Sequence, residues 1–403
     1  MSILRRWRLA VGSLVLVLVS FTAGVWVDQA FPESVPVVGA FPQQRGQLDQ
    51  GTLQQALRII RADYYSSNLN SDSLSHGSVK GMVDSLNDPY SRYLSPQQYR
   101  SQQDAYAGRH EGAIGIYVDF RGGYPAVTGV LPDSPALRAG LETDDVILRV
   151  DGKDTHGLSP DQASALIRGP VGRNVRLHLR RGTAELDVTV RRENFQSPTV
   201  LSFRFPEDLL YVRVYEFGDG TEKEFDSQLQ AGQTGARGVI LDLRNNGGGL
   251  VTAAVAMISR FVASGEVFEE RGRDGRTDRT FVDGNHPAAS VPLVVLVNGN
   301  SASAAEIVAG SLQAHGRAKL VGTKTFGKGS VQVDYVLRDG SDLHLTVQHW
   351  FLPDGRSING TGLTPDIAIN LSDQSAMFDV VQPSRGYGGD TQLNRARQLL
   401  GAG

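Results

Sequence analysis

The chain has 403 residues, of which 40% are hydrophobic and 21% are charged, and its 40 Lys and Arg nearly balance 43 Asp and Glu. This length and composition allow two or three domains with buried cores. They argue against intrinsic disorder and against electrostatic binding of nucleic acid. The chain contains no cysteine, which excludes disulfides, thiolate metal sites and a cysteine nucleophile.

The amino terminus carries a targeting signal. An uncharged stretch from Leu9 to Val27 follows three arginines and is long enough to span a bilayer. We expect residues 1–30 to be a membrane anchor or a cleaved signal peptide, and in both cases the remainder of the chain is exported. The poor small-x-small pattern at the end of the stretch favours the anchor. Residues 31–47 contain three prolines and are expected to form a linker.

The folded part divides into regions with different residue patterns. Apolar residues at helical spacing predict short helices within 48–106, interrupted at Asp88-Pro89-Tyr90-Ser91. Alternating patterns predict a domain of short strands over 107–195, and strands mixed with helices follow over 196–372. The polar tail, 373–403, ends in a predicted short helix.

Four spaced motifs in the 107–195 region resemble the centre of a PDZ domain. They are Ser134-Pro135-Ala136, Ala139-Gly140-Leu141, Asp145-Val146-Ile147 and Val150-Asp151-Gly152. Upstream, the segment Ala113, Ile114, Gly115, Ile116 matches the loop whose backbone N–H groups receive a terminal carboxylate in that family. The resemblance implies a β-domain that binds the C-termini of other proteins.

A helix that would flank the peptide groove is predicted to begin at Ser159, because Ser-Pro-Asp-Gln offers an N-cap, a proline at the first helical position and a capping glutamine. It ends before Gly169. We expect Leu166 on its apolar face and Arg168 at its end to contact the peptide. For Arg168, a charge that complements the helix C-terminus is an equally good interpretation.

A strand, a tight turn and a helix are predicted around Ser303. Residues 291–297 are short, apolar and β-branched, as in a strand buried on both faces, and a helical pattern begins after the turn. Ser303 therefore lies near a helix N-terminus, where unpaired N–H groups favour developing negative charge. On geometry alone, an ordinary N-cap serine would explain this residue better than a nucleophile.

Further motifs favour the interpretation of Ser303 as a nucleophile. The chain resembles the tail-specific, carboxyl-terminal processing proteases, which are serine peptidases with a Ser-Lys pair and an embedded PDZ domain. The motifs that carry the resemblance are Asp88-Pro-Tyr-Ser, Leu241-Asp-Leu-Arg-Asn-Asn, Ser301-Ala-Ser-Ala, Phe326-Gly-Lys-Gly and Pro353-Asp-Gly-Arg-Ser-Ile. It implies a mixed α+β and α/β multidomain fold with a peptidase core over 196–372.

The resemblance also assigns the catalytic residues. It implies Ser303 as nucleophile, Lys328 as general base and Gln332 as the residue that holds the lysine. The oxyanion donors would be the backbone N–H of Ala304 and that of Gly249 or Gly248. The chain departs from the family pattern at two positions: Ala305 replaces a serine and Gly247 replaces a proline.

Such a mechanism requires an unusual lysine. A solvated lysine is almost wholly protonated at neutral pH and cannot accept the proton of Ser303, whereas burial lowers the pKa of its amine by several units. None of the eight histidines lies in the Ser303 turn or the Lys328 loop. Four residues along a straight strand would separate Lys328 from Gln332 by about 13 Å, so the role of Gln332 requires a bend.

Other polar motifs receive structural interpretations. Glu306 is expected to cap the helix that begins after Ser303 or to pair with Arg244, and Asp242 is expected to belong to the framework. The run from Gly322 to Lys328 matches seven positions of a phosphate-binding loop, but Gly329 stands where such loops need Ser or Thr. No acidic cluster shows metal-ligand spacing, so we expect no metal and no cofactor.

These observations predict an exported endopeptidase on the periplasmic side of the inner membrane. The resemblance implies substrates with exposed apolar C-termini, a homo-oligomer assembled through the 48–106 region, and an adaptor protein as a further partner. One alternative is an inactive PDZ scaffold of the cell envelope, against which the presence of both Ser303 and Lys328 argues. Another is a non-peptidase hydrolase on the same core.

Overall fold

The computed structural model describes residues 49–402 except 67, 108, 372–375, 382, 384 and 385. The predicted anchor and linker lie outside the described residues. No helix within the described ranges is long and apolar enough to cross a membrane. The chain divides into two units, residues 1–73 and 74–403. Helix α2 (Gln50–Asp63) lies in the first unit, and α3 (Ser71–Asp84) extends from the first into the second.

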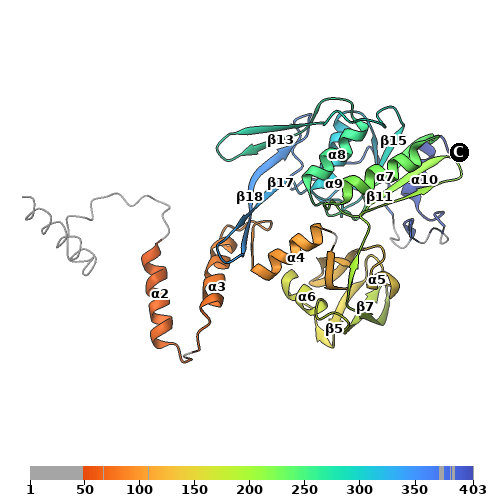
Figure 1. Cartoon of the computed structure of the whole chain (residues 1–403). Coiled ribbons are helices and arrows are strands. Elements are labelled where there is room, and N and C mark those ends of the chain that lie inside the picture. The colour runs from red at the N-terminus through yellow and green to blue at the C-terminus, as the bar shows by residue number, and fades with distance from the viewer. Residues whose placement is uncertain are drawn as a thin grey trace, which may run out of the picture. The chain divides into compact units, whose positions relative to one another are not determined.

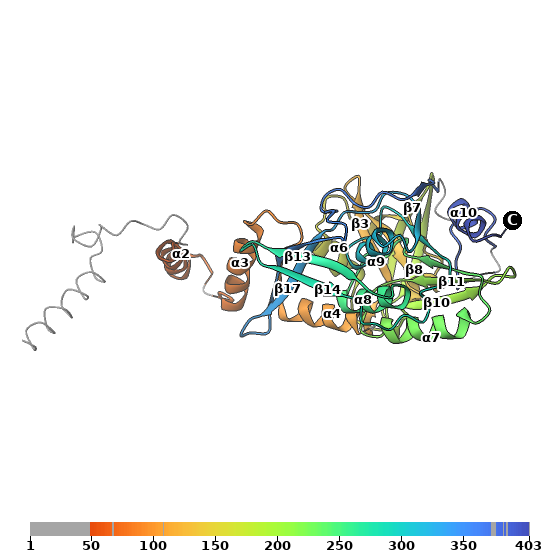
Figure 2. The ribbon, with the colours of Figure 1, turned by 90° about the horizontal axis from the view of Figure 1, so that it is seen from above.

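The core of the second unit is a six-stranded sheet between helices (Figure 2). Its strands, in spatial order, are β10 (Val200–Arg204), β11 (Leu209–Val214), β12 (Gly238–Asp242), β15 (Leu293–Val297), β16 (Lys319–Gly322) and β19 (Ile367–Ala368). All neighbours pair in parallel except β10 with β11. Every residue of β15 is buried, which confirms the strand predicted from its apolar run.

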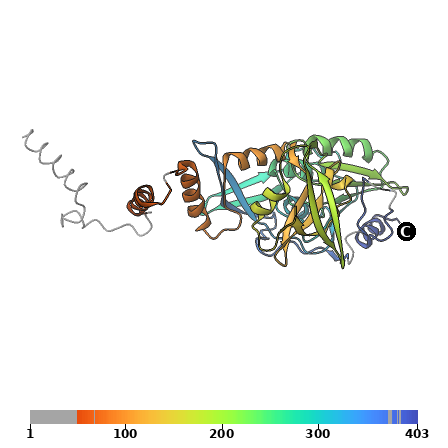
Figure 3. The same cartoon turned by 90° about the horizontal axis from the view of Figure 1, so that it is seen from below.

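Helices cover both faces of this sheet, so its side chains alternate between two hydrophobic cores. The larger core contains side chains from α7 (Thr221–Gln233), α8 (Val251–Phe261) and α9 (Ala304–Ala314). The opposite core contains side chains from α10 (Thr391–Leu399), dark blue beside the C-terminus in Figure 3. Burial on both faces explains why the central strands are apolar throughout.

A buried ion-pair network attaches the C-terminal helix to this sheet. The Arg244 guanidinium is 1% exposed and contacts the carboxylates of Asp242, at the end of β12, and Asp390. Asp390 in turn caps α10 by accepting a hydrogen bond from Leu393 N at 2.9 Å. These contacts confirm the framework role predicted for Asp242, and they show that Arg244 pairs with Asp242 and Asp390 instead of Glu306.

A second, antiparallel sheet lies beside the core and carries the lysine loop. It contains β1 (Arg92–Leu94), β18 (Asp342–Phe351), β13 (Glu266–Gly272) and β14 (Thr277–Phe281), in that order. Strand β17 (Ser330–Val336) pairs with β18 as a long hairpin (Figure 1). Helix α4 (Pro96–Tyr106) begins just after β1, with a capping box formed by Ser95 and Gln98.

The PDZ region forms its own sheet around a separate hydrophobic core. The spatial order is β3 (Ile116–Arg121), β4 (Tyr124–Val130), β5 (Val146–Val150), β7 (Asn174–Arg181) and β8 (Ala184–Arg191), with β6 (Lys153–Asp154) paired to β5. Two helices, α5 (Pro135–Arg138) and α6 (Pro160–Ile167), complete it, and β2 (Arg109–Ala113) pairs with β9 (Glu193–Gln196). The capping box of Ser159 and Gln162 is present as predicted, and Gly140 ends α5 at φ 80°.

Candidate active site

Ser303 occupies a strained turn between β15 and α9. It is the N-cap of α9, with φ 55° and ψ −119°, a conformation that costs a non-glycine residue about 1–3 kcal/mol. Neighbouring hydrogen bonds hold the turn: Ser301 Oγ donates to Leu243 O at 2.8 Å and accepts from Asn298 N at 2.9 Å. The predicted strand, turn and helix are confirmed, and the positive φ distinguishes Ser303 from an ordinary N-cap, which has β-region dihedrals.

The glycine turn after β12 packs directly against the serine turn. A Cβ atom added to Gly248 would lie 2.7 Å from Ser303 Cβ and 3.0 Å from Ala304 N, so only glycine fits there. Ala304 is the first residue of α9, where helical N–H groups have no intrahelical acceptor. The Gly248 N–H donates to Asn246 Oδ1 at 2.8 Å and would have to leave it to bind an oxyanion. Gly249 has φ 135° and packs closely against Phe217 O.

Glu306 joins the serine turn to the lysine loop. Its Oε2 accepts hydrogen bonds from the backbone N–H groups of Ser303 at 3.0 Å and Lys328 at 2.9 Å. Its Oε1 accepts from Thr325 Oγ1 at 2.5 Å and from Gly327 N at 2.8 Å. Burial raises the pKa of the carboxyl, although these four donors oppose the rise. The predicted cap is therefore confirmed, and the same side chain also positions the backbone of Lys328.

The environment of Lys328 lowers the pKa of its amine to about 8. Burial is the largest cause, and the nearby charge of Arg92 lowers it further, while Asp88 and Glu306 oppose the shift. The Nζ atom lies 5.2 Å from the centre of the Tyr90 ring. None of the ion pairs between described residues includes Lys328. About a tenth of this lysine is therefore neutral near pH 7, compared with well under 1% of a solvated lysine, and the neutral amine is the form that a general base requires.

Gln332 lies on β17 beside a bulge in the pairing with β18. Its Nε2 donates to Ser330 Oγ at 2.8 Å and to Thr346 Oγ1 at 3.1 Å. Neither of these hydrogen bonds involves Lys328. The side chain of Gln332 thus contacts hydroxyl groups of its own hairpin, and its role in holding Lys328 stays a prediction.

Tyr90 and Arg92 are two neighbours of Lys328 for which the sequence indicated no role at the site. Tyr90 belongs to the Asp88-Pro89-Tyr90-Ser91 motif, one of those that carry the family resemblance. The carboxylate of Asp88 accepts from Tyr90 N at 3.1 Å and from Ser91 Oγ at 2.6 Å, so this acid also shapes the turn. The motif could have pointed to Tyr90 as a site residue. Its contact with the Lys328 loop, more than 200 residues away along the chain, could not be read from the sequence.

The predicted peptide-binding residues surround an edge of the PDZ sheet. Ala113 and Ile114 are buried, and Gly115 has φ 84° in the loop that leads into β3, which begins at Ile116. Strand β3 is the edge strand of the sheet, and α6 packs against it. Leu166 on α6 is partly buried in the PDZ core. Arg168 is the exposed C-cap of α6.

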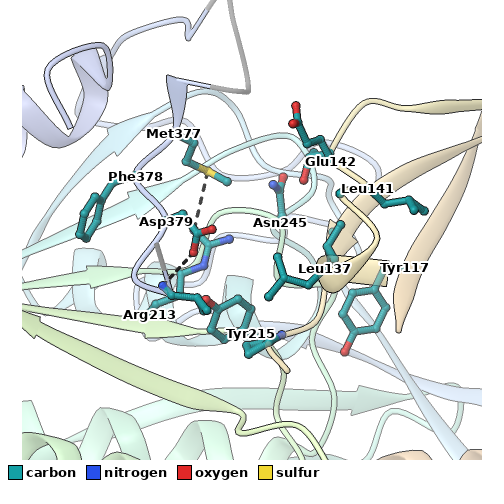
Figure 4. Close-up of a pocket in the computed structure, with 16 residues that line it drawn as sticks. Tyr117, Leu137, Leu141, Glu142, Arg213, Tyr215, Asn245, Met377, Phe378 and Asp379 are labelled. Carbon is teal, nitrogen blue, oxygen red and sulfur yellow. Dashed lines mark hydrogen bonds between the residues drawn. The ribbon is translucent and has the colours of Figure 1, made fainter. Parts of the chain in front are cut away.

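A pocket lies between the PDZ region and the core, lined by residues of both (Figure 4). Leu137 and Leu141 line it from the PDZ side, and Arg213 and Asn245 line it from the core side. Asn245 immediately precedes Asn246 and the glycine turn that packs against Ser303. The pocket therefore extends to a residue adjacent to the candidate oxyanion turn.

Comparisons with known proteins agree with this architecture. The model of peptidase family S41 matches residues 208–369, that of a PDZ domain matches 126–181, and that of the N-terminal domain of the activating protease CtpB matches 34–97. A probable CtpA-like serine protease of Staphylococcus haemolyticus is 33% identical over 377 residues, which are 93% of this chain and 75% of that protein. Its counterpart in Staphylococcus aureus strain MRSA252 is 33% identical over 374 residues, 91% of this chain and 73% of that protein.

Solved structures show the same organisation. A photosystem II D1 C-terminal processing protease superposes with a TM-score of 0.63 at 28% identity, over 80% of this chain and 88% of that one. An S41 protease from Bacteroides fragilis has a TM-score of 0.56 at 18% identity, over 89% of this chain and 98% of that one, which supports the fold alone. The fold and site define a serine peptidase with an embedded PDZ domain. The chain belongs to peptidase family S41, among its carboxyl-terminal processing proteases.

The four hydrogen bonds of Glu306 predict a large effect of changing this side chain. Glu306→Gln replaces one acceptor oxygen by an NH₂ group, so two buried donors lose their acceptor, at an expected cost of about 2–4 kcal/mol in the free energy of unfolding. Thermal or denaturant unfolding measures this loss. The control Glu222→Gln, on the surface of α7, should change stability by less than about 0.5 kcal/mol. Equal effects of the two substitutions would contradict the central position of Glu306.

Proposed function

We propose that this chain is an exported Ser-Lys endopeptidase that recognises the C-terminal tails of envelope proteins and cleaves them through an acyl-enzyme. The observation that carries the proposal is the Glu306 carboxylate, whose Oε2 holds the backbones of Ser303 and Lys328 together. A largely desolvated lysine without an ion pair, whose backbone N–H shares the Glu306 carboxylate with that of a serine at a helix N-terminus, suits serine activation without histidine.

The proposed reaction begins with a neutral Lys328. Its amine accepts the proton of the Ser303 hydroxyl as Oγ attacks the scissile carbonyl carbon. The N–H of Ala304, with that of Gly249 or Gly248, would stabilise the oxyanion. The lysine ammonium then protonates the leaving amine, and an ester remains on Ser303. A water molecule, deprotonated by the same lysine, hydrolyses this ester and releases the second product.

Tail recognition would use the free edge of the PDZ sheet. A peptide can add to β3 as a further strand, with main-chain hydrogen bonds that do not depend on its sequence. Its terminal carboxylate would meet the N–H groups of the 113–116 loop, and its last side chain would lie near Leu166. Arg168, at the end of α6, would add a positive charge at this groove.

The cellular setting is part of the proposal. The stretch from Leu9 to Val27 suggests that the enzyme acts on the periplasmic side of the inner membrane. Helix α2 buries none of its side chains, and Leu53, Ile59 and Ile60 are between 38% and 52% exposed. An apolar surface of this kind supports assembly into a homo-oligomer through this helix. An adaptor protein remains a further proposed partner.

Tail recognition can be tested with three versions of one substrate protein that differ only in the C-terminal tail. The first tail ends in apolar residues with a free carboxylate, the second is the same tail amidated, and the third ends in aspartates. We expect kcat/KM to fall by at least about tenfold for the second and third tails, because each loses a PDZ contact. Leu166→Glu should abolish most of the difference by weakening binding of the first tail. Equal cleavage of all three tails by the unmodified enzyme would contradict tail recognition and leave the peptidase activity itself intact.

A further inference from the structure

Three side chains on the β17–β18 hairpin form a cluster that the peptidase mechanism does not use. Asp342 and His344 are two residues apart on β18 and therefore share one face of the sheet. Asp334 of β17 is the direct cross-strand partner of His344. One ligand atom from each residue lies within 4.8 Å of the other two, and this is the one group of its kind in the described part of the chain.

Asp342 is buried and forms no ion pair with a described residue, although the charge of Arg92 acts on it from nearby. Its side chain is 0% exposed, and neither carboxylate oxygen has a hydrogen-bond partner of normal geometry, although the backbone N–H groups of Tyr335 and Leu343 lie nearby. Burying such a carboxylate is costly unless another group compensates it. The two oxygens are therefore available to a cation that reaches the cluster.

The neighbouring cations do not pair with these acids. Arg92 of β1 is the register partner of His344, but its Nη2 donates to Gln102 Oε1 at 2.7 Å. No ion pair among the described residues joins Arg92 to Asp334 or Asp342. From α4, the neutral Gln103 amide donates to Asp334 Oδ2 at 3.4 Å. Lys328 is close enough to affect His344 electrostatically, but it is directed to the Tyr90 ring.

We propose that Asp334, Asp342 and His344 bind a divalent transition-metal cation of the zinc class. One imidazole with two carboxylates is a donor set suited to Zn²⁺, and less to Mg²⁺ or Ca²⁺, which prefer oxygen alone. His344 Nδ1 and Asp334 Oδ1 are 2.6 Å apart, so one cation can replace the proton between them. A tetrahedral zinc site needs ligand atoms about 3.4 Å apart, so the widest separation would have to close by at most about 1.4 Å and the 2.6 Å pair would have to open by about 0.8 Å.

A cation bound at this cluster would connect two strands of the second sheet. Asp334 is two residues from Gln332 on β17, and a cation would join this strand to β18 beside the segment that carries Lys328. No metal was expected from the sequence, because these ligands have no characteristic spacing along the chain. Only the antiparallel pairing of β17 with β18 brings Asp334 to the other two.

Titration of the metal-free full chain with Zn²⁺ tests the proposal. Isothermal titration calorimetry should find one ion per chain at this cluster, with a dissociation constant of about 10 µM or lower. Zn²⁺ should also raise the unfolding temperature, because it binds the folded state. Mg²⁺ at the same concentration should do neither. With Co²⁺ as a spectroscopic probe, visible absorption typical of nitrogen and oxygen ligands should appear.

Matched variants locate the binding. Asp342→Asn and His344→Ala should each weaken Zn²⁺ binding by at least tenfold and abolish the thermal shift. Because Asp342→Asn removes an uncompensated buried charge, its metal-free form should unfold at the same temperature as the unmodified chain or higher. The control His178→Ala removes an imidazole that also contacts two carboxylates, Glu185 and Asp187, on the PDZ surface, and it should leave this binding unchanged. Absence of stoichiometric binding, or equal binding by the unmodified chain and both cluster variants, would overturn the proposal.

Discussion

Ser303→Ala and Lys328→Ala are each expected to reduce cleavage of a protein with an apolar tail by at least about a thousandfold, and the double variant should lose little more. The non-additivity has a physical reason: the hydroxyl cannot attack without a base, and the amine has no proton to accept without the hydroxyl. Single-turnover cleavage, followed by the appearance of peptide fragments, measures the loss.

Two controls separate this effect from misfolding. Lys324→Ala removes an exposed lysine from the same loop and should leave cleavage unchanged. Lys328→Met keeps the length of the side chain without its amine, so the variant should be inactive. It should also be about 1–3 kcal/mol more stable at pH 7, because the environment of Lys328 disfavours the charged form of the native lysine. Cleavage by Lys328→Ala at the rate of the unmodified chain would contradict the assignment of the base.

The rate of cleavage should rise with pH through the titration of Lys328. Burial lowers the pKa of this amine from 10.5 to about 8, and the neutral form is the active one. At pH 6 about 1% of the lysine is neutral, compared with about half at pH 8, so kcat/KM should increase by about fiftyfold between these values and level off above pH 9.

The same shift predicts how stability changes with pH. Between about pH 8 and 10.5, the unfolded chain binds a proton at this lysine that the folded chain has released. The free energy of unfolding should therefore increase with pH between about 8 and 10.5, and this contribution is absent below pH 8. Lys328→Met should remove this dependence. A rate profile with a midpoint near pH 6.5 would instead indicate a histidine base and contradict the role of Lys328.

Local patterns in the sequence predicted much of the fold. The strand, turn and helix around Ser303 follow from an apolar β-branched run, a polar turn and a helical repeat. The helix after Ser159 follows from its capping residues, and the structure contains both. Each of these predictions depends on residues within about a dozen positions of one another, where backbone preferences and side-chain periodicity act directly.

Contacts between distant segments could not be predicted in this way. The sequence suggested Glu306 as a helix cap, but its hydrogen bonds to Gly327 and Lys328 depend on how two loops meet. The Tyr90 ring beside the lysine and the cluster that contains Asp334 depend on strand pairing in the second sheet. The hydroxyl partners of Gln332 are likewise set by the register of its hairpin.

The most direct test of the account measures the pKa of Lys328 itself. Chains with ¹³C-labelled lysine, compared with Lys328→Met to assign the signal, allow the amine to be titrated by NMR in the otherwise intact enzyme. We expect a midpoint near pH 8 for this lysine, well below the ordinary value of about 10.4 for a solvated lysine. A midpoint above 10 for Lys328 would mean that the amine is charged at working pH and cannot be the base.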